Sequence, residues 1–342
     1  MDSDLFVLHC GGYSGLEVSE LTGALEAEGA RFSYRPSIPN VSRAVADMPR
    51  AAAATRRLAL SFFACLELLF SHGDPYDIIG EIHRGIPETK AASLKVKVIR
   101  SRGAIPPAKV LELERKVGRA LSAKMKAEVN LKNPEAEFIL FVSERGFIFG
   151  RKIQAAARRD LNSRTNRLKP FKHPSTLQPD LSRALVNIAR IRRGDTVIDP
   201  YCGVGGILLE ISEIGATAVG LDFKHKMIYG ARRNLMHYGN SLWHLIRGDA
   251  RKPPFIKAEG IVTDPPYGRL SPRIGGTMIE ELHDSFVAFS AEALSKNRCL
   301  SLICPSDFPM EAKLKRSGFK ILSLNELRVH GGLTRVFISA RR

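Results

Sequence analysis

The stretch TVIDPYCGVGG, residues 196–206, decides the fold: an apolar run ends in an aspartate and closely spaced glycines follow. Three later apolar runs also end in small or acidic residues, at GLD (220–222), GDA (248–250) and DPPYG (264–268). Segments with helical spacing of apolar residues separate these runs. Alternating strands and helices of this kind are typical of a doubly wound parallel sheet. Two closing β-rich runs without a helix between them predict an antiparallel hairpin at one edge.

The residues at these strand ends predict a nucleoside-binding site. Ligands bind doubly wound sheets at the carboxyl ends of the strands. Gly203 and Gly205 allow the backbone to approach a ligand closely. Asp222 is placed to accept hydrogen bonds from both hydroxyls of a ribose, and Asp249 to accept one from an adenine amino group.

A nicotinamide dinucleotide is the first alternative for this ligand. The G-x-G-x-x-G fingerprint of dinucleotide folds would need glycine at position 208, where the sequence has Leu208. The pattern that cradles a pyrophosphate is therefore incomplete. A ligand with ribose and adenine but no pyrophosphate fits better, so we expect the cofactor to be S-adenosyl-L-methionine.

The fourth strand end, Asp264-Pro265-Pro266-Tyr267, suits transfer of a methyl group to an amine on a nucleobase. Such an amine is a poor nucleophile because its lone pair is conjugated into the ring. The Asp264 carboxylate and the Pro265 carbonyl would accept its two N–H bonds and orient the lone pair. Tyr267 would stack on a base extruded from its helix. The alternative interpretation is a rigid loop with an ordinary tyrosine.

Charge predicts a polyanionic partner. Lys+Arg number 52 and Asp+Glu 35, so the net charge is +17 and its field attracts nucleic acid. Basic residues concentrate in 151–172, where prolines near the end indicate a domain boundary. The alternative is a solvated charged surface. We predict that six basic residues contact RNA: Lys109, Arg115, Lys116, Arg158, Arg159 and Arg164.

The N-terminal half has the mixed pattern of α+β domains. Its predicted elements are a strand at 5–10, a helix at 14–29, a mostly buried helix at 58–71, a strand at 93–100, a basic amphipathic helix from Pro106–Pro107 to about 127, and a hairpin at 137–153.

The motifs together resemble a known family. DPYCGVGG, GLD, GDA and DPPYG, in this order, resemble Rossmann-like amino-methyltransferases of the [N/D]-P-P-[Y/F/W] type. VNLKNPEAEFILFVSERGFIFGRKI, after SLKVKVIR and a helix, resembles the THUMP domain of RNA-modifying enzymes, and LKPFKHPSTLQPDLSRALVNIARIRRGD resembles the start of their catalytic domain. This order of domains is similar to that of tRNA (guanine-10-N2)-methyltransferases.

The resemblance implies a domain organisation and a set of site residues. The domains would be a ferredoxin-like domain (1–58), a THUMP RNA-binding domain (59–157), a basic linker (158–178) and a Rossmann-like methyltransferase domain (179–342). Asp264, Pro265 and Tyr267 would be catalytic. The cofactor-binding residues would be Thr176, Leu177, Asp199, Tyr201, Gly203, Gly205, Asp222, Phe223, Asp249, Ala250 and Asp264. His173 is expected to be structural, and Cys202 a packing residue.

The implied activity is methylation of the exocyclic N2 of guanine at position 10 of tRNA, once or twice. DPPY motifs also serve adenine-N6 and cytosine-N4 enzymes, so another tRNA or rRNA base stays open. A non-catalytic RNA-binding protein that keeps the cofactor fold is a further alternative, which a methyl-transfer assay would distinguish. The expected partners are tRNA and, as in some relatives, a small activating subunit.

Two features indicate a cytoplasmic protein without a membrane segment. The N-terminus MDSDLFVLHCGG lacks the features of a signal peptide, and the apolar run Leu58–Phe70 is too short to span a bilayer. The cysteines form no CxxC pair, which favours reduced thiols over disulfides or a metal site. They are Cys10, Cys65, Cys202, Cys299 and Cys304.

Overall fold

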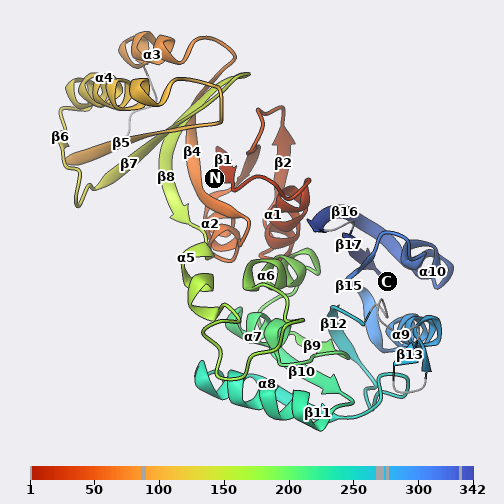
Figure 1. Cartoon of the computed structure of the whole chain (residues 1–342). Helices are drawn as coiled ribbons and strands as arrows, with labels where there is room; N and C mark the ends of the chain where they lie inside the picture. The colour runs from red at the N-terminus through yellow and green to blue at the C-terminus, as the bar shows by residue number, and fades with distance from the viewer. Residues whose placement is uncertain (1, 86–89, 267–272, 275–276, 331–332) are drawn as a thin grey trace. The chain divides into compact units, whose positions relative to one another are not determined.

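The chain folds into two compact units (Figure 1). The computed structural model describes residues 2–85, 90–266, 273–274, 277–330 and 333–342. The first unit comprises residues 1–10, 30–56 and 61–156, and the second comprises residues 11–29, 57–60 and 157–342. No helix in the described ranges is both long and apolar enough to cross a membrane.

The first unit is built on an eight-stranded sheet with the order β2-β3-β1-β4-β8-β7-β5-β6. Its strands are β1 (Asp2–His9), β2 (Phe32–Arg35), β3 (Val41–Asp47), β4 (Ser61–Ser71), β5 (Ser93–Arg100), β6 (Glu128–Val129), β7 (Ala136–Ser143) and β8 (Gly146–Ala155). Its helices are α2 (Met48–Arg56), the short η1 (Pro75–Asp77), α3 (Ile78–Gly85) and α4 (Pro107–Met125). The predicted strand at 93–100, the basic helix and the hairpin are confirmed as β5, α4 and β7–β8.

The boundary predicted at residue 58 falls inside this fold. The element order β1-α1-β2-β3-α2-β4 is that of a ferredoxin-like unit. Its last strand, β4, lies beyond residue 58, and β4 pairs with both β1 and β8. Residues on both sides of the predicted boundary therefore contribute to one continuous sheet.

The helix predicted at 58–71 is wrong, because most of this segment forms strand β4. A short apolar run does not distinguish a buried strand from a buried helix by its periodicity. Exposure does not alternate regularly along β4, since Phe63, Ala64 and Cys65 are all buried. Pairing with β1 on one side and β8 on the other satisfies the backbone, so tertiary context decides the conformation.

The second unit contains a seven-stranded sheet with the order β11-β10-β9-β12-β15-β17-β16. Its strands are β9 (Thr196–Asp199), β10 (Thr217–Asp222), β11 (Trp243–Arg247), β12 (Ala258–Thr263), β15 (Leu294–Pro305), β16 (Lys320–His330) and β17 (Leu333–Arg341); β13 (Arg273–Ile274) and β14 (Thr277–Met278) form a separate pair. The first five strands of the order are parallel, and β17 and β16 are antiparallel. The predicted doubly wound sheet with an antiparallel edge hairpin is confirmed.

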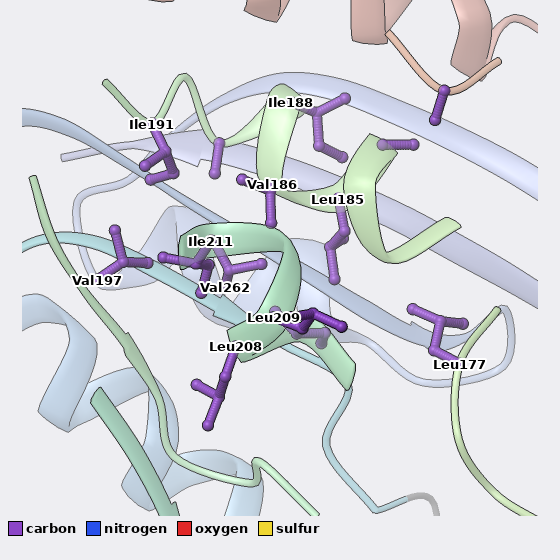
Figure 2. Close-up of a cluster of buried hydrophobic side chains, with 14 of the residues drawn as sticks. Leu177, Leu185, Val186, Ile188, Ile191, Val197, Leu208, Leu209, Ile211 and Val262 are labelled. Carbon is purple, nitrogen blue, oxygen red and sulfur yellow. The ribbon is translucent and has the colours of Figure 1, made fainter. Parts of the chain in front are cut away.

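Helices pack around this sheet to form the core of the second unit (Figure 1). They are α1 (Leu16–Ala27), α5 (Arg158–Leu161), η2 (Asn162–Arg164), α6 (Pro179–Ile188), α7 (Gly206–Glu213), α8 (His225–His237), α9 (Ile279–Ala293) and α10 (Met310–Arg316). Figure 2 shows apolar side chains of α6 and α7 gathered with those of β9 and β12. Burying one such leucine stabilises the fold by about 1.5–3 kcal/mol. The labelled residues are Leu177, Leu185, Val186, Ile188, Ile191, Val197, Leu208, Leu209, Ile211 and Val262.

A buried carboxylate ties N-terminal segments into the second unit. Glu20 of α1 accepts hydrogen bonds from the backbone N–H groups of Ala59 (2.7 Å) and Leu60 (2.9 Å). It also accepts one from Nδ2 of Asn187 in α6, at 2.8 Å. Burial raises the pKa of Glu20 to about 7, and these three bonds oppose that shift. Helix α1, residues 57–60 and α6 are thus joined by one polar network.

Close packing reinforces this network. A Cβ added to Gly23 of α1 would lie 2.2 Å from the carbonyl oxygen of Asn187. Buried Arg57 donates to Oδ1 of Asn187 at 2.8 Å and to the carbonyl of Ile191 at 2.7 Å. The unit that holds the parallel sheet therefore extends beyond the predicted range 179–342, because α1 and residues 57–60 supply buried partners that α6 needs.

Gly23→Ala should destabilise the protein by about 1–3 kcal/mol, since the added methyl must push α1 away from the backbone of α6. Chemical denaturation monitored by circular dichroism would measure the change. Gly80→Ala is the matched control: Gly80 lies in helix α3, where, among the described residues, the added Cβ would meet only Nη2 of Arg84, at 3.8 Å. Equal stability of the two variants would contradict the close contact of α1 with α6.

Candidate active site

A cavity of about 430 Å³ opens at the carboxyl ends of β9, β10, β11 and β12. The chain order of the strands reverses between β9 and β12, the place where doubly wound sheets bind ligands. Of the predicted site residues, those that line this cavity are Thr176, Leu177, Asp199, Tyr201, Gly203, Asp222, Phe223, Asp249, Ala250, Asp264 and Pro265. Tyr267, predicted to stack on the base, lies outside the described residues.

The glycine loop after β9 leaves room on the cavity side. Gly203 has φ +51°, and a Cβ added there would meet no described heavy atom within 4 Å. A side chain at this position would fill open space that a ligand can use. Gly205 is placed differently from the prediction, since it does not line the cavity. Its φ is +81°, and a Cβ there would lie 3.2 Å from the Cβ of Ala231, so it serves the turn and the approach of α8.

Asp222, the last residue of β10, is held in place by the backbone. Its Oδ2 accepts from the N–H of Gly203 at 3.1 Å, and its Oδ1 from the N–H of Lys224 at 2.8 Å. Burial raises the pKa of Asp222, and these bonds oppose the shift. Each carboxylate oxygen keeps a lone pair for another donor. The neighbouring Phe223 is 61% exposed and presents an apolar surface to the same cavity.

Asp249 follows β11 and is already engaged by a neighbouring cation. Nε of Arg251 donates to both of its oxygens, at 3.0 and 2.9 Å, and this hydrogen bonding lowers the pKa of Asp249. Both side chains line the cavity. Asp249 therefore stays ionised and keeps acceptor capacity beside Arg251.

Asp199 differs in character from the other acidic residues of the cavity. It is 1% exposed, and burial raises its pKa to about 7. Its Oδ1 accepts from the Oγ1 of Thr263 at 2.6 Å and from the N–H of Tyr201 at 3.1 Å. Because Thr263 is the last residue of β12, this contact joins the ends of β9 and β12 immediately before Asp264.

Asp264 follows β12, and the pKa of its carboxyl group is close to neutral pH. Burial raises its pKa to about 7, and the positive charge of Arg335 opposes the shift. Its Oδ1 is buried, and among the described residues it has no hydrogen-bond partner. Buried polar atoms are almost always hydrogen-bonded, so this oxygen indicates a place for a donor from a ligand. Pro265 and Pro266 line the cavity beside it.

The predicted RNA contacts divide into exposed and buried residues. Lys109, Arg115 and Lys116 are exposed on α4, where the two lysines form ion pairs with Glu112. The prediction for Arg164 is wrong: its guanidinium is buried against two carboxylates, those of Glu210 and Glu213. A basic residue in a charged stretch can equally supply an internal ion pair, and sequence alone did not separate the two cases.

The structure places three of the four remaining candidates, Arg158, His173 and Cys202, and leaves the side chain of Arg159 undescribed. Arg158 lies near the Tyr13 hydroxyl: burial and the negative charge of Asp180 raise the pKa of Tyr13, and the positive charge and hydrogen bond of Arg158 oppose that shift. The side chain of Arg159 lies outside the described part of the chain. Half-buried His173 lines the cavity and contacts the Oγ of Ser175 at 2.7 Å. Cys202 is buried, which raises the pKa of its thiol, in keeping with a packing role.

Sequence reasoning missed two arginines of the cavity, Arg251 and Arg335. Arg251 was detectable, since it follows the GDA motif directly. Arg335 had no local signal, because it lies in a β-rich run far from the motifs. It enters the site through the antiparallel pairing of β17 with β15.

The strand order and the acidic residues at the strand ends define a class of protein: this is a Rossmann-like methyltransferase. Comparison with known families places it further. The chain belongs to the UPF0020 family, described as RMKL-like, methyltransferase domain, which matches residues 166–336, half of the chain.

Two curated relatives and one solved structure illustrate the similarity. A tRNA (guanine(10)-N2)-dimethyltransferase of Methanothermobacter thermautotrophicus is 32% identical over 225 residues, 66% of this chain and 66% of that protein. The enzyme of the same name from Pyrococcus abyssi is 29% identical over 277 residues, 79% of this chain and 81% of that protein. The crystal structure of TrmN from Thermus thermophilus shares the fold, with TM-score 0.53, 23% identity and 99% of each chain covered.

Asp222→Ala should weaken binding of S-adenosyl-L-methionine by about 1–3 kcal/mol, the range for lost hydrogen bonds to a charged group. Isothermal titration calorimetry on the folded variant would measure this loss. Asp307→Ala, which removes an exposed carboxylate outside the cavity, is the control. An unchanged affinity for Asp222→Ala would remove this residue from the binding site.

Proposed function

We propose that this protein is a tRNA (guanine-N2)-methyltransferase that uses S-adenosyl-L-methionine and acts at position 10, adding one or two methyl groups. The observation that carries the proposal is the buried Asp264 carboxyl, whose Oδ1 has no hydrogen-bond partner among the described residues, in a cavity shared with Asp222. The names of the two archaeal relatives support tRNA and guanine N2 as the substrate and atom.

The cavity residues fit the proposed cofactor. The open space beside Gly203 admits a ligand against the backbone, and Asp222 can accept from ribose hydroxyls. Asp249 can accept from an adenine amino group, and the exposed ring of Phe223 offers an apolar surface for the adenine. When bound, S-adenosyl-L-methionine supplies an electrophilic methyl group.

Asp264 and Pro265 would activate the amine of guanine. The Asp264 carboxylate accepts one N–H of the amine, and the Pro265 carbonyl accepts the other. This orients the nitrogen lone pair out of the ring system. Methyl transfer to this nitrogen would release a proton from it, and the Asp264 carboxylate would accept that proton. A carboxyl group with a pKa of about 7 suits this exchange near neutral pH.

The first unit would grip the tRNA. We infer a THUMP-type RNA-binding role for it, supported by exposed Lys109, Arg115 and Lys116 on α4 and by the net charge of +17. A tRNA substrate implies a cytoplasmic activity. If a small activating subunit is required, an outer strand of the sheet, β11 or β16, is the edge at which it would add a strand.

Wild-type enzyme incubated with a tRNA pool and labelled cofactor should produce N2-methylguanosine, measured by mass spectrometry of nucleosides.

Asp264→Asn should reduce the single-turnover rate by about 100-fold or more, because an amide cannot accept the proton that the amine loses. Cofactor affinity and tRNA affinity should stay close to those of wild type. A near-normal rate for Asp264→Asn would overturn the proposed role of the carboxylate.

The single-turnover rate should rise with pH. Asp264 acts as the carboxylate, and its pKa is raised to about 7, so the active form is lost as the pH falls through this value. The rate at pH 6 should be about one tenth of the plateau above pH 8, since one pH unit below the pKa leaves about a tenth of the group ionised. Rapid-quench assays at saturating cofactor would give this profile. A rate independent of pH between 6 and 8 would contradict it.

A further inference from the structure

Arg335 reaches the cavity from the antiparallel edge of the sheet. It lies near the start of β17 and pairs with Pro305, the last residue of β15. Strand β15 runs parallel to its neighbour β12, so Pro305 and Asp264 both lie at the carboxyl ends of their strands. Arg335 and Asp264 accordingly line one cavity.

The other cations of the cavity belong to its cofactor side. Lys224 follows β10, and Arg251 follows β11 and is bonded to Asp249. Both strands lie on the far side of β9 from β12. Among the described residues that line the cavity, Arg335 is therefore the only arginine or lysine on the same side of β9 as Asp264.

Two hydrogen-bond acceptors for an amine do not by themselves distinguish one nucleobase from another. Asp264 and the Pro265 carbonyl accept N–H bonds, and adenine, cytosine and guanine all carry an exocyclic amine. Guanine has the carbonyl O6 across the ring nitrogen N1 from its N2 amine, and cytosine has O2 across N3 from its N4 amine, whereas adenine has a C–H group across N1 from its N6 amine. A guanidinium contains donors and no acceptor, so it suits a carbonyl at this place and forms no hydrogen bond with the C–H group of adenine.

We propose that Arg335 recognises the carbonyl of the target base: its guanidinium donates to O6 of the guanine while Asp264 holds the N2 amine. This inference rests on the proposed function and specifies how guanine is distinguished from adenine. The effect of Arg335 on Asp264, whose pKa it lowers, supports the placement of both groups in one part of the cavity.

The test compares two target bases in otherwise identical tRNA. 2-Aminopurine keeps the 2-amine of guanine but lacks O6 and the N1–H. Single-turnover rates are measured with guanosine or 2-aminopurine riboside at the target, for wild type and Arg335→Met, by mass spectrometry of the N2-methylated nucleosides. Each rate is taken at the high-pH plateau, because loss of the arginine charge raises the pKa of Asp264.

Arg335→Met should lower the guanosine rate by about 10- to 100-fold, the equivalent of one or two charged hydrogen bonds, and leave the 2-aminopurine rate nearly unchanged. The preference for guanosine should collapse accordingly. Arg328→Met, on the exposed part of neighbouring β16 and outside the cavity, is the matched control and should keep the wild-type preference.

Equal losses on both bases would overturn the inference, since they would show a structural role for Arg335. If Arg335→Met does not fold, Arg335→Lys replaces it: the lysine keeps the charge but loses the planar fork of guanidinium donors, so the guanosine preference should shrink while the 2-aminopurine rate holds. Equal losses with this variant would also overturn the inference. A wild type that methylates no guanine N2 is a separate result, which overturns the proposed function and the inference with it.

Discussion

The hydrogen bond from the Thr263 hydroxyl to the buried Asp199 carboxyl is the contact on which the site depends. It joins the ends of the two strands between which the sheet order reverses, and the cavity opens at that point. The same carboxyl accepts from the N–H of Tyr201, so the start of the glycine loop is fixed to the strand that presents Asp264. Asp199 thus acts as a structural centre around which both halves of the cavity are arranged.

Around this centre, burial and backbone contacts give similar side chains different chemical properties. The contact with Arg251 keeps Asp249 ionised, and two backbone N–H groups hold Asp222 in place. Burial raises the pKa of Asp264 toward neutral pH. An enzyme that must bind a cofactor and also accept a proton from an amine needs both kinds of carboxyl group. All three residues are aspartates, and their different surroundings give them different functions.

The second unit is also held together by a contact that is remote in sequence. Glu20 connects α1 with residues 57–60 and with Asn187 of α6, and each partner satisfies a buried polar group of another. Leaving any one of them unpaired would cost about 1–3 kcal/mol. This explains why the sheet-bearing unit draws on two N-terminal segments as well as on its own continuous chain.

Local pattern in the sequence determined the alternation of strands and helices, the strand ends with their acidic residues, and eleven of the described residues that line the cavity, because these follow from side-chain periodicity and short motifs. Only the tertiary structure decided that residues 61–71 form a strand, that Arg164 is an internal ion-pair partner, and that α1 belongs with the parallel sheet. Arg335 was equally beyond the sequence, since its place depends on the antiparallel register of β17 with β15. Each of these depends on which distant segment lies alongside, and burial and hydrogen-bond partners exist only once the chain has been brought together.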